Sequence, residues 1–305
     1  MRITVIGAAN IDITAKSKGK IVPGDSNPAD VVLKAGGTAR NIAAMLAMRK
    51  NEVDLITAIG NDPFGNLLRE SCIAIGINTD AWITKNNTST GVYLATLENT
   101  GEIHAGFNAI SAPESIRTAE LTKHKKIIKD ADLMILDLNL TEKIIALSLD
   151  LREDGPVLVE AVSIDKVQRI KSLLDRVDIL RLNRIEAEEL TGMTLDTKER
   201  VRQAGYNLVG RGVKRVFITL GVAGVCAADE GNAIFVPALP IASKGVKGIK
   251  GAGDAFTTGL AVSLEKDIRA QAETGVKFAA EHLERNVIRD GLNDDNKATS
   301  SKRRV

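Results

Sequence analysis

The sequence predicts an α/β protein with a mostly parallel central sheet, flanking helices and a small antiparallel β-sheet. Three observations support this fold class. After residue 131, short apolar segments alternate with amphipathic segments in the rhythm of βαβ units. In the N-terminal half, two polar segments with alternating hydrophobicity interrupt that rhythm. The chain has 305 residues, 44% of them hydrophobic and 26% charged, which is enough for one large core.

The first expected element is a strand at 2–7, a short β-branched run that ends at Gly7 and is typical of a strand buried on both faces. The G-x-G-x-x-G pattern of a dinucleotide-binding turn does not follow it. Instead, Asn10 and Asp12 come next, at the edge where open α/β sheets bind ligands. The alternative is that both side chains only satisfy backbone groups of a turn.

The small β-sheet is expected from residues 13–34 and 88–108. The first segment contains a dense turn signal at 23–28, and the second is a hairpin around 99–101. We expect the two segments to pair in space as a lid over the C-terminal edge of the main sheet. The ranges 1–12, 35–87 and 109–292 then form the core, and the polar tail 293–305 is expected to be disordered.

The core elements follow in order. A Gly-Gly turn at 36–37 leads into a helix, and a strand at 53–59 and a helix at 66–74 come next. Alternating strands and helices make right-handed crossovers, so the later strands should be parallel. Those strands are expected at 133–136, 157–160, 179–182, 215–220, 225–228 and 233–236, and helices at 142–151, 166–174, 184–190, 198–211 and 267–283.

Composition excludes several functions. Lys and Arg total 41 against 39 Asp and Glu, and aromatic residues are only 3%, so we expect neither a nucleic-acid partner nor a membrane surface. The apolar run at 3–9 is too short for a membrane span. Cys72 and Cys226 are expected to be buried thiols, and a cytoplasmic location follows. The histidines lack the spacing of a metal site or triad and are expected on the surface or in packing: His104, His124 and His282.

The turn at 251–254, Gly-Ala-Gly-Asp, precedes an apolar pattern with helical spacing. Small residues at the start of a helix let backbone N–H groups face an anion such as phosphate. Asp254 would repel that anion, unless the carboxylate must accept a proton from an alcohol. The alternative is that Asp254 caps the helix.

Six patterns in register resemble the ribokinase-like (PfkB) family of carbohydrate and nucleoside kinases, over the chain up to about residue 290. They are Asn10 with Asp12, Gly36-Gly37 with Asn41, Gly60-x-Asp62-x-x-Gly65, Asn183-x-x-Glu186, Thr219-Leu220-Gly221-x-x-Gly224, and the turn at 251–254. The resemblance implies a ribokinase-like fold and phosphoryl transfer from ATP to a small sugar or nucleoside. It also implies Mg²⁺ and allows for a monovalent cation.

The resemblance assigns roles to the matching residues. Asp254 would be the catalytic base, and the amides of Gly251, Ala252 and Gly253 would stabilise the charge on the transferred group. Glu186 would hold Mg²⁺ through water, because this cation keeps several waters. The remaining nucleotide-binding residues would be Asn183, Thr219, Gly221, Gly224 and Lys250. Without the resemblance, a capped helix with solvated glutamates would explain the segment 183–189.

A narrower similarity is to the pseudouridine kinase branch of the family, through four patterns: Asp25-Ser26-Asn27-Pro28, Gly7-x-Ala9-Asn10-Ile11-Asp12, Gly37-x-x-Arg40-Asn41-Ile42-Ala43 and Asp137-Leu138-Asn139. It implies phosphorylation of the 5′-hydroxyl of pseudouridine. The implied substrate-binding residues are Asn10, Asp12, Asp25, Ser26, Asn27, Gly37, Arg40, Asn41, Asp137 and Asn139. The alternative for 25–28 is a plain turn.

Two departures from the family pattern keep other functions open. Gly248-Ile249-Lys250 replaces Asp or Asn, a variable residue and Thr, and Glu160-Ala161 replaces Asp-Pro. The alternatives are another sugar or nucleoside kinase, a changed phosphate donor, or a binding protein with weak turnover. A dinucleotide oxidoreductase is disfavoured by the missing glycine pattern. Exposed lid edges further predict a homodimer that forms through the lid.

Overall fold

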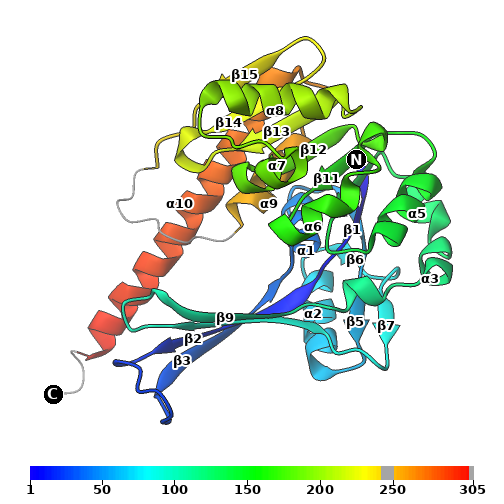
Figure 1. The fold of residues 1–305 in the computed structure, drawn as a ribbon. Helices are drawn as coiled ribbons and strands as arrows, with labels where there is room; N and C mark the ends of the chain where they lie inside the picture. Colours follow the sequence, from blue (N-terminus) through cyan, green and yellow to red (C-terminus); the bar gives the residue numbers. More distant parts are fainter. Residues whose placement is uncertain (242–250, 302–305) are drawn as a thin grey trace. The chain divides into compact units, whose positions relative to one another are not determined.

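The computed structural model describes residues 1–241 and 251–301, and side chains as far as Arg285. The chain divides into two compact units, Met1–Arg176 and Val177–Val305. Each unit contains strands and helices (Figure 1). The small β-sheet belongs to the first unit, and the division into a core and a lid stays a prediction.

The first unit carries a parallel group of strands in the order β11-β10-β1-β4-β6. Ile3, Val5 and Ile6 are fully buried, as expected for a β-branched strand covered on both faces. The carboxyl ends of these strands face one edge, which brings the segments after β1 and β10 together. The bounds are β1 (Arg2–Ile6), β4 (Glu52–Ile56), β6 (Ile77–Asn78), β10 (Leu133–Asp137), β11 (Val157–Glu160), α1 (Thr38–Ala47), α2 (Pro63–Ile73) and α5 (Glu142–Arg152).

The small sheet has the order β3-β2-β8-β9, which confirms that the two expected β segments pair. β2–β3 and β8–β9 are antiparallel hairpins, but β2 and β8 run parallel, so the sheet is not wholly antiparallel. More than seventy residues separate the end of β2 from the start of β8, enough for the crossover that a parallel pair needs. The bounds are β2 (Asn10–Ser17), β3 (Ala29–Gly36), β8 (Gly91–Leu97) and β9 (Ile103–Ala109).

Two expected elements of the first unit are wrong in detail. The strand expected at 53–59 is two strands, β4 and β5 (Ala58–Gly60), and β5 pairs with β7 (Ile83–Lys85) in a separate sheet. The helix expected at 166–174 is a short helix α6 (Ile164–Val167) followed by two 3-10 turns. The three apolar residues of the predicted helix, Val167, Ile170 and Leu174, are nevertheless buried, because a series of short turns also places them in the core. Short helices α3 (Thr118–Thr122) and α4 (Lys125–Lys129) precede β10.

The second unit has the strand order β15-β14-β13-β12. β12 and β13 are parallel, whereas β14 pairs antiparallel with both β13 and β15, which corrects the expectation of parallel strands here. The connections at 220–224 and 229–232 are too short for a crossover. The bounds are β12 (Ile179–Asn183), β13 (Arg215–Thr219), β14 (Val225–Ala228), β15 (Ala233–Val236), α7 (Arg184–Thr191), α8 (Lys198–Gly210), α9 (Ala252–Ala261) and α10 (Ile268–Ser301).

Helices α9 and α10 pack closely in the second unit, since a Cβ atom on Gly259 would lie 2.7 Å from Cα of Gly275. Phe256 of α9 also meets Phe217 of β13 edge-on, with 6.2 Å between ring centroids. α10 continues to Ser301, across most of the tail that composition predicts to be disordered, and no proline follows Pro240 to stop it. None of the described helices combines the length and apolarity of a membrane span.

Candidate active site

Asp137 ends strand β10 and is fully buried. Its Oδ2 accepts the N–H groups of Ala8 and Ala39, each at 2.9 Å, and its Oδ1 accepts the N–H of Asn139 at 2.9 Å. Burial raises the pKa of this carboxyl, while the three N–H donors favour the charged form. We therefore assign Asp137 to holding the loop after β1 and the start of α1, in place of the substrate contact that the sequence suggests.

Asn10 and Asp12 form the first polar pair of the candidate substrate site. They are the first and third residues of β2, and Asn10 Nδ2 donates to Asp12 Oδ1 at 2.7 Å. Register places Asn10 opposite Gly36 of β3, where a Cβ atom would come within 2.6 Å of Asp12 Oδ1. The structure thus brings Asn10, Asp12 and the Gly-Gly turn together, as the sequence predicts for one ligand site.

Gly37 begins α1 with a positive φ of 99°, and a Cβ atom there would lie 2.5 Å from the carbonyl oxygen of Ala8. Glycine is needed at this position for close packing of the backbone. Arg40 Nη1 donates to the carbonyl of Ala35 at 3.2 Å and contacts Asn41 Oδ1 at 3.5 Å. Arg40 therefore braces the turn, and Asn41 lies beside it on the first turns of α1.

Asn139 follows β10 and is 4% exposed. Its Oδ1 accepts a short hydrogen bond from Lys166 Nζ on α6, a residue that the sequence reasoning missed. Burial lowers the pKa of Lys166, and the nearby Asp137 carboxylate opposes that shift. Arg169 supports the same loop by donating to the carbonyls of Leu138 and Leu140, at 3.2 and 2.8 Å. The loop after β10 is therefore held by two basic side chains.

The segment 25–27 forms an exposed turn at the far end of the β2–β3 hairpin. Asn27 Oδ1 accepts from Val22 N at 2.8 Å and its Nδ2 donates to the carbonyl of Asp25 at 2.9 Å, while Ser26 N donates to Asp25 Oδ1. Ser17 lies seven residue steps along β2 from Asn10, or about 23 Å at 3.3 Å per residue. Within one chain, Asp25, Ser26 and Asn27 are therefore not brought to the polar pair.

The Gly60-x-Asp62-x-x-Gly65 pattern joins the main body of the first unit to β8. Asp62 caps α2 by accepting from Gly65 N at 2.8 Å, and its other oxygen accepts from Thr90 N at 2.7 Å. Partial burial acts to raise the pKa of Asp62, but these N–H donors and the Thr90 hydroxyl together hold it below its ordinary value. The pattern thus positions the start of the small sheet.

The segment that replaces the family Asp-Pro also lies in the first unit. Glu160 is 2% exposed and pairs in register with Asp137 across β10 and β11. Two residues later, Val162 has a φ of 71°, and Ser163 N donates to the carbonyl of Ala161 at 2.9 Å. A β-branched residue in the left-handed region is strained, so this turn is held by its surroundings.

The Gly-Ala-Gly-Asp turn begins helix α9 in the second unit. Gly251 is the N-cap with a φ of 91°, and no side chain caps the helix there. By contrast, Asp62, Thr141, Asn183 and Thr197 cap α2, α5, α7 and α8. Asp254 lies in the first turn and is half-buried, so its expected alternative role as the N-cap is wrong. The first N–H groups of a helix lack partners within that helix and favour an anion.

A pocket of about 800 Å³ opens beside this turn, within the second unit. Thr219, Gly221 and Gly224, which the sequence predicts to bind the nucleotide, are among its lining residues. Gly224 has a φ of 95°, and a Cβ atom there would lie 2.1 Å from the carbonyl oxygen of Val236. The other lining residues are mostly apolar: Arg181, Val222, Ala238, Leu239, Pro240, Ile241, Ala252, Gly253, Phe256, Val276, Ala279, Ala280 and Leu283. Such walls suit a flat ring system with few polar contacts.

Asn183 and Glu186 form a reciprocal capping box at the start of α7. Asn183 Oδ1 accepts from Glu186 N at 3.0 Å, and Glu186 Oε2 accepts from Asn183 N at 2.7 Å. Glu186 is 2% exposed, so it is not the solvated glutamate of the alternative explanation. Burial raises its pKa, while the Asn183 N–H and the charge of Arg181 favour ionisation. In the described part of the chain, no three acidic, His or Cys side chains cluster to hold a metal. A cation here would rely on Glu186, water and phosphate.

Two further side chains contact the turn, and the sequence reasoning missed both roles. A Cβ atom on Gly253 would lie 2.8 Å from Nη2 of Arg181, and one on Gly251 would lie 2.8 Å from Nε2 of His282. A charged residue inside the apolar strand 179–183 is the signal that marks Arg181 in the sequence. His282 has no such signal. Lys250 and Gly248, which the sequence places near the phosphates, lie outside the described residues.

The pfkB family of carbohydrate kinases matches residues 1–290, and the chain belongs to this family. It is 32% identical to a pseudouridine kinase of Escherichia coli K12 over 85% of this chain and 82% of that one. It is 25% identical to a guanosine-inosine kinase of Exiguobacterium acetylicum over 92% and 93% of the chains. The structure of Arabidopsis thaliana ribokinase complexed with ribose and ATP matches with a TM-score of 0.78 and 26% identity over 91% of each chain. The fold is therefore ribokinase-like.

Proposed function

We propose that this kinase transfers the γ-phosphoryl group of ATP to the 5′-hydroxyl of pseudouridine. The observation that carries the phosphoryl-transfer part is in the second unit. There, an apolar pocket meets a helix start that lacks a side-chain cap and bears Asp254 in its first turn. The nucleoside part is supported by 32% identity to a pseudouridine kinase, together with the polar pair Asn10 and Asp12 beside the Gly-Gly turn.

Each residue has a chemical task in this proposal. The carboxylate of Asp254 accepts the proton of the attacking hydroxyl. The N–H groups of 251–254 stabilise the negative charge of the transferred group. Glu186 helps to hold Mg²⁺, which when bound neutralises phosphate charge. Asn10, Asp12 and Asn41 bind the ribose, and Asn139 with Lys166 lies at the neighbouring strand end. No role for a monovalent cation follows from the described residues.

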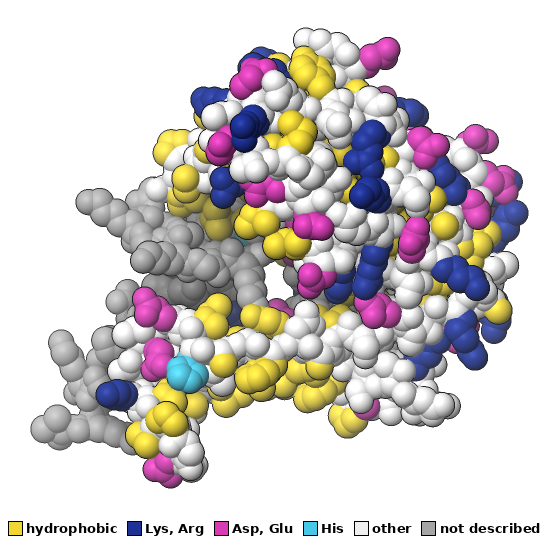
Figure 2. Space-filling model, in the orientation of Figure 1, with side chains coloured by type: hydrophobic (Ala, Val, Ile, Leu, Met, Phe, Trp, Pro, Cys, Tyr) yellow, Lys and Arg dark blue, Asp and Glu magenta, His cyan; other side chains and the backbone are white. Residues whose placement is uncertain are grey.

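We further propose that the chain forms a homodimer through the small sheet. Both edge strands, β3 and β9, are largely exposed, and apolar side chains gather along this sheet (Figure 2). Monomeric proteins rarely leave such an edge uncovered. The exposed apolar residues are Val31, Val32, Leu33, Ile103 and Phe107, each between 46% and 60% exposed. Light scattering should show a dimer, and Val32→Lys with Phe107→Lys should yield monomers. A wild-type monomer at micromolar concentration would refute this proposal.

The substrate is tested by a panel of acceptors with ATP and Mg²⁺, with product identified by mass. Pseudouridine has an extra ring N–H compared with uridine, and a site that pairs this group rejects the analogue that lacks it. We expect kcat/KM for pseudouridine to exceed that for uridine, guanosine, inosine and ribose. A preference for ribose, or for guanosine and inosine, would identify another kinase of the family. Equal turnover of pseudouridine and uridine would leave only the family assignment.

A binding protein with weak turnover is distinguished in the same panel, because ligand would bind without ADP release. The cytoplasmic location and the absence of a nucleic-acid partner stay predictions. Of the two departures from the family pattern, the segment 248–250 is the one adjoining the catalytic turn. GTP and CTP as donors therefore belong in the panel, since a changed donor preference was one consequence expected from this segment.

A further inference from the structure

Arg181 lies close to three family patterns of the second unit, namely Asn183-x-x-Glu186, the segment 219–224 and the turn 251–254. It is the third residue of β12, and its neighbours Leu180 and Leu182 are fully buried, so alternation turns Arg181 to the other face of the strand. Its Nη2 donates to Thr219 Oγ1 at 3.0 Å. Its guanidinium also faces Gly253, where a Cβ atom would lie 2.8, 3.0 and 3.1 Å from Nη2, Nη1 and Cζ.

The contact with Thr219 holds the guanidinium in one orientation. Thr219 Oγ1 accepts from Arg181 and can donate to the carbonyl of Leu182 at 3.4 Å, so the hydroxyl is fixed between the two strands. Glycine at 253 leaves the space that the guanidinium fills. A planar cation held in this way needs little further ordering to bind an anion.

The place of Arg181 along the pocket indicates which part of a nucleotide it meets. Arg181, Thr219 and Gly253 line the same pocket, and most of its other lining residues are apolar. If a ring system binds in this pocket with its phosphates directed to the α9 turn, those phosphates lie next to the guanidinium, because the guanidinium faces Gly253 of that turn. The positive charge of Arg181 also acts on Glu186, the residue expected to serve the metal.

We propose that Arg181 is a phosphate ligand of this kinase, which binds the β-phosphate and stabilises the negative charge that develops there as the β–γ bridging P–O bond breaks. This inference rests on the proposed function, because it assumes a nucleoside triphosphate in the second-unit pocket. In the balanced step, the substrate oxygen forms a bond to the γ-phosphorus, the hydroxyl proton passes to Asp254, and the bridging oxygen leaves with ADP. Arginine suits this position because its fork donates two N–H groups to phosphate oxygens.

The test compares ADP with AMP as probes, by calorimetric titration of the full chain with and without Mg²⁺. We expect Arg181→Gln to weaken ADP binding roughly 10- to 100-fold, the usual cost of a lost charged hydrogen bond, and to leave AMP within about 3-fold. With ATP and acceptor, kcat should fall roughly 10²- to 10³-fold while KM for the acceptor stays within about 3-fold. A role confined to packing would weaken ADP and AMP alike.

The matched control is Arg184→Gln, which removes an exposed arginine three residues away on α7 and should change neither nucleotide's affinity. If Arg181→Gln does not fold, Arg181→Lys keeps the charge without the fork and should weaken ADP several-fold but not AMP. If a folded variant at position 181 has the same ratio of ADP affinity to AMP affinity as the wild type, this inference alone is overturned. A wild-type chain that binds neither nucleotide overturns the proposed function and this inference together.

Discussion

The carboxylate of Asp137 occupies the space that a side chain at position 7 would need, since a Cβ atom on Gly7 would lie 2.3 Å from Asp137 Cγ. Gly7 therefore serves the contact between β1 and β10. The dinucleotide type of turn uses glycine at this place to approach a phosphate, but here a protein carboxylate fills the space and accepts the N–H of Ala8. The same aspartate also accepts from the first turn of α1, which carries Asn41.

Replacing Asp137 should therefore destabilise the first unit. Asp137→Asn would place an NH₂ group against backbone N–H donors in a fully buried site, and we expect a loss of roughly 2–4 kcal/mol in the free energy of unfolding. Urea denaturation measures it. Asp80→Asn, at an exposed carboxylate of the same unit, should stay within about 0.5 kcal/mol. Equal denaturation midpoints for the two variants would remove the structural role from Asp137.

Asp254→Asn should lower turnover roughly 10²-fold or more and change ADP affinity by only a few-fold, because it removes the proton acceptor and leaves the pocket. Steady-state kinetics and ADP titration provide the two measurements. The control is Asp267→Asn in the same unit, since Asp267 does cap a helix, with Ala270 N donating to Oδ1 at 2.9 Å. A turnover for Asp254→Asn within a few-fold of wild type would show that Asp254 is not the base.

Glu186 should make the magnesium requirement depend on pH. Burial raises its folded pKa above the ordinary value, so the ionised form that binds the metal's water shell is lost earlier as pH falls. We expect the half-saturating Mg²⁺ concentration of the wild type to increase as pH falls from 8 toward the ordinary glutamate value of 4.5. For Glu186→Gln this concentration should be higher at pH 8 and should change less with pH. The ratio of the variant's half-saturating Mg²⁺ concentration to that of the wild type should therefore fall toward one in acid. A constant ratio across this range would contradict a metal role for Glu186.

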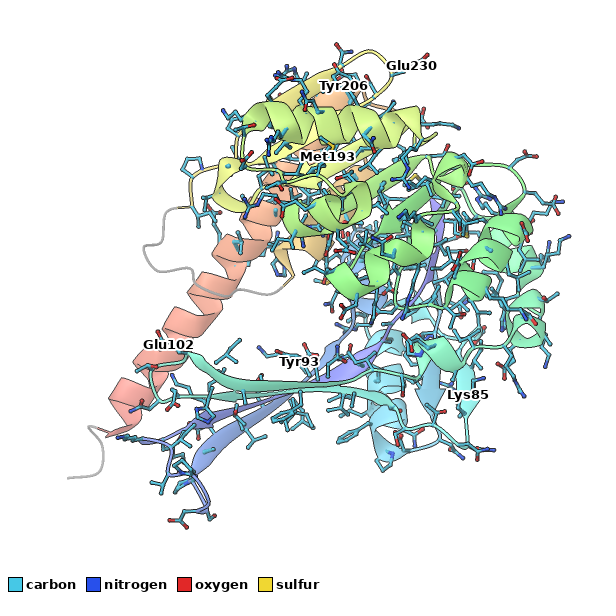
Figure 3. The ribbon with its side chains drawn as sticks, viewed as in Figure 1. Lys85, Tyr93, Glu102, Met193, Tyr206 and Glu230 are labelled. Atoms are coloured by element: carbon cyan, nitrogen blue, oxygen red, sulfur yellow. The ribbon has the colours of Figure 1, made fainter. Side chains whose placement is uncertain are left out.

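Glu120 should contribute stability that disappears in acid. Hydrogen bonds from Arg117 and Lys85 hold its pKa at about 2 instead of 4.5, although partial burial alone would raise the pKa. Lys85 donates from β7 (Figure 3), and its Nζ lies 2.5 Å from Glu120 Oε2. Because the folded pKa is depressed, the contribution is complete above about pH 4.5 and is lost as pH falls toward 2.

We therefore expect Glu120→Gln to have a lower unfolding temperature than wild type at pH 7, and the difference to shrink between pH 5 and pH 3. Calorimetric scans at fixed ionic strength measure the change. Glu102→Gln, at an exposed glutamate of the small sheet for which no ion pair is described, should show no such trend (Figure 3). A gap between wild type and Glu120→Gln that is independent of pH would disprove the depressed pKa.

Local patterns in the sequence predicted much of the fold. Strands such as β11 (Val157–Glu160) and β14 (Val225–Ala228) were predicted with their observed bounds, because a short apolar run between turn residues has few alternatives. The direction of β14 was not predicted, because it depends on the length of a connection and not on the strand's own residues. The pairing of the two β segments into one small sheet was predicted and is confirmed.

The amino-acid sequence by itself determined the family of this protein, its α/β class and the position of the Gly-Ala-Gly-Asp turn, since spacing along one chain is a local property. Only the tertiary structure decided which polar side chains hold the backbone in place and which line a ligand pocket. Asp137 and Asn27 belong to patterns that match the pseudouridine kinase branch, yet their side chains form hydrogen bonds with backbone groups of the protein itself. Arg181 belongs to no pattern, yet it meets Thr219 and Gly253 across two other segments. A hydrogen bond joins atoms that are close in space, and folding sets that distance between residues far apart in sequence.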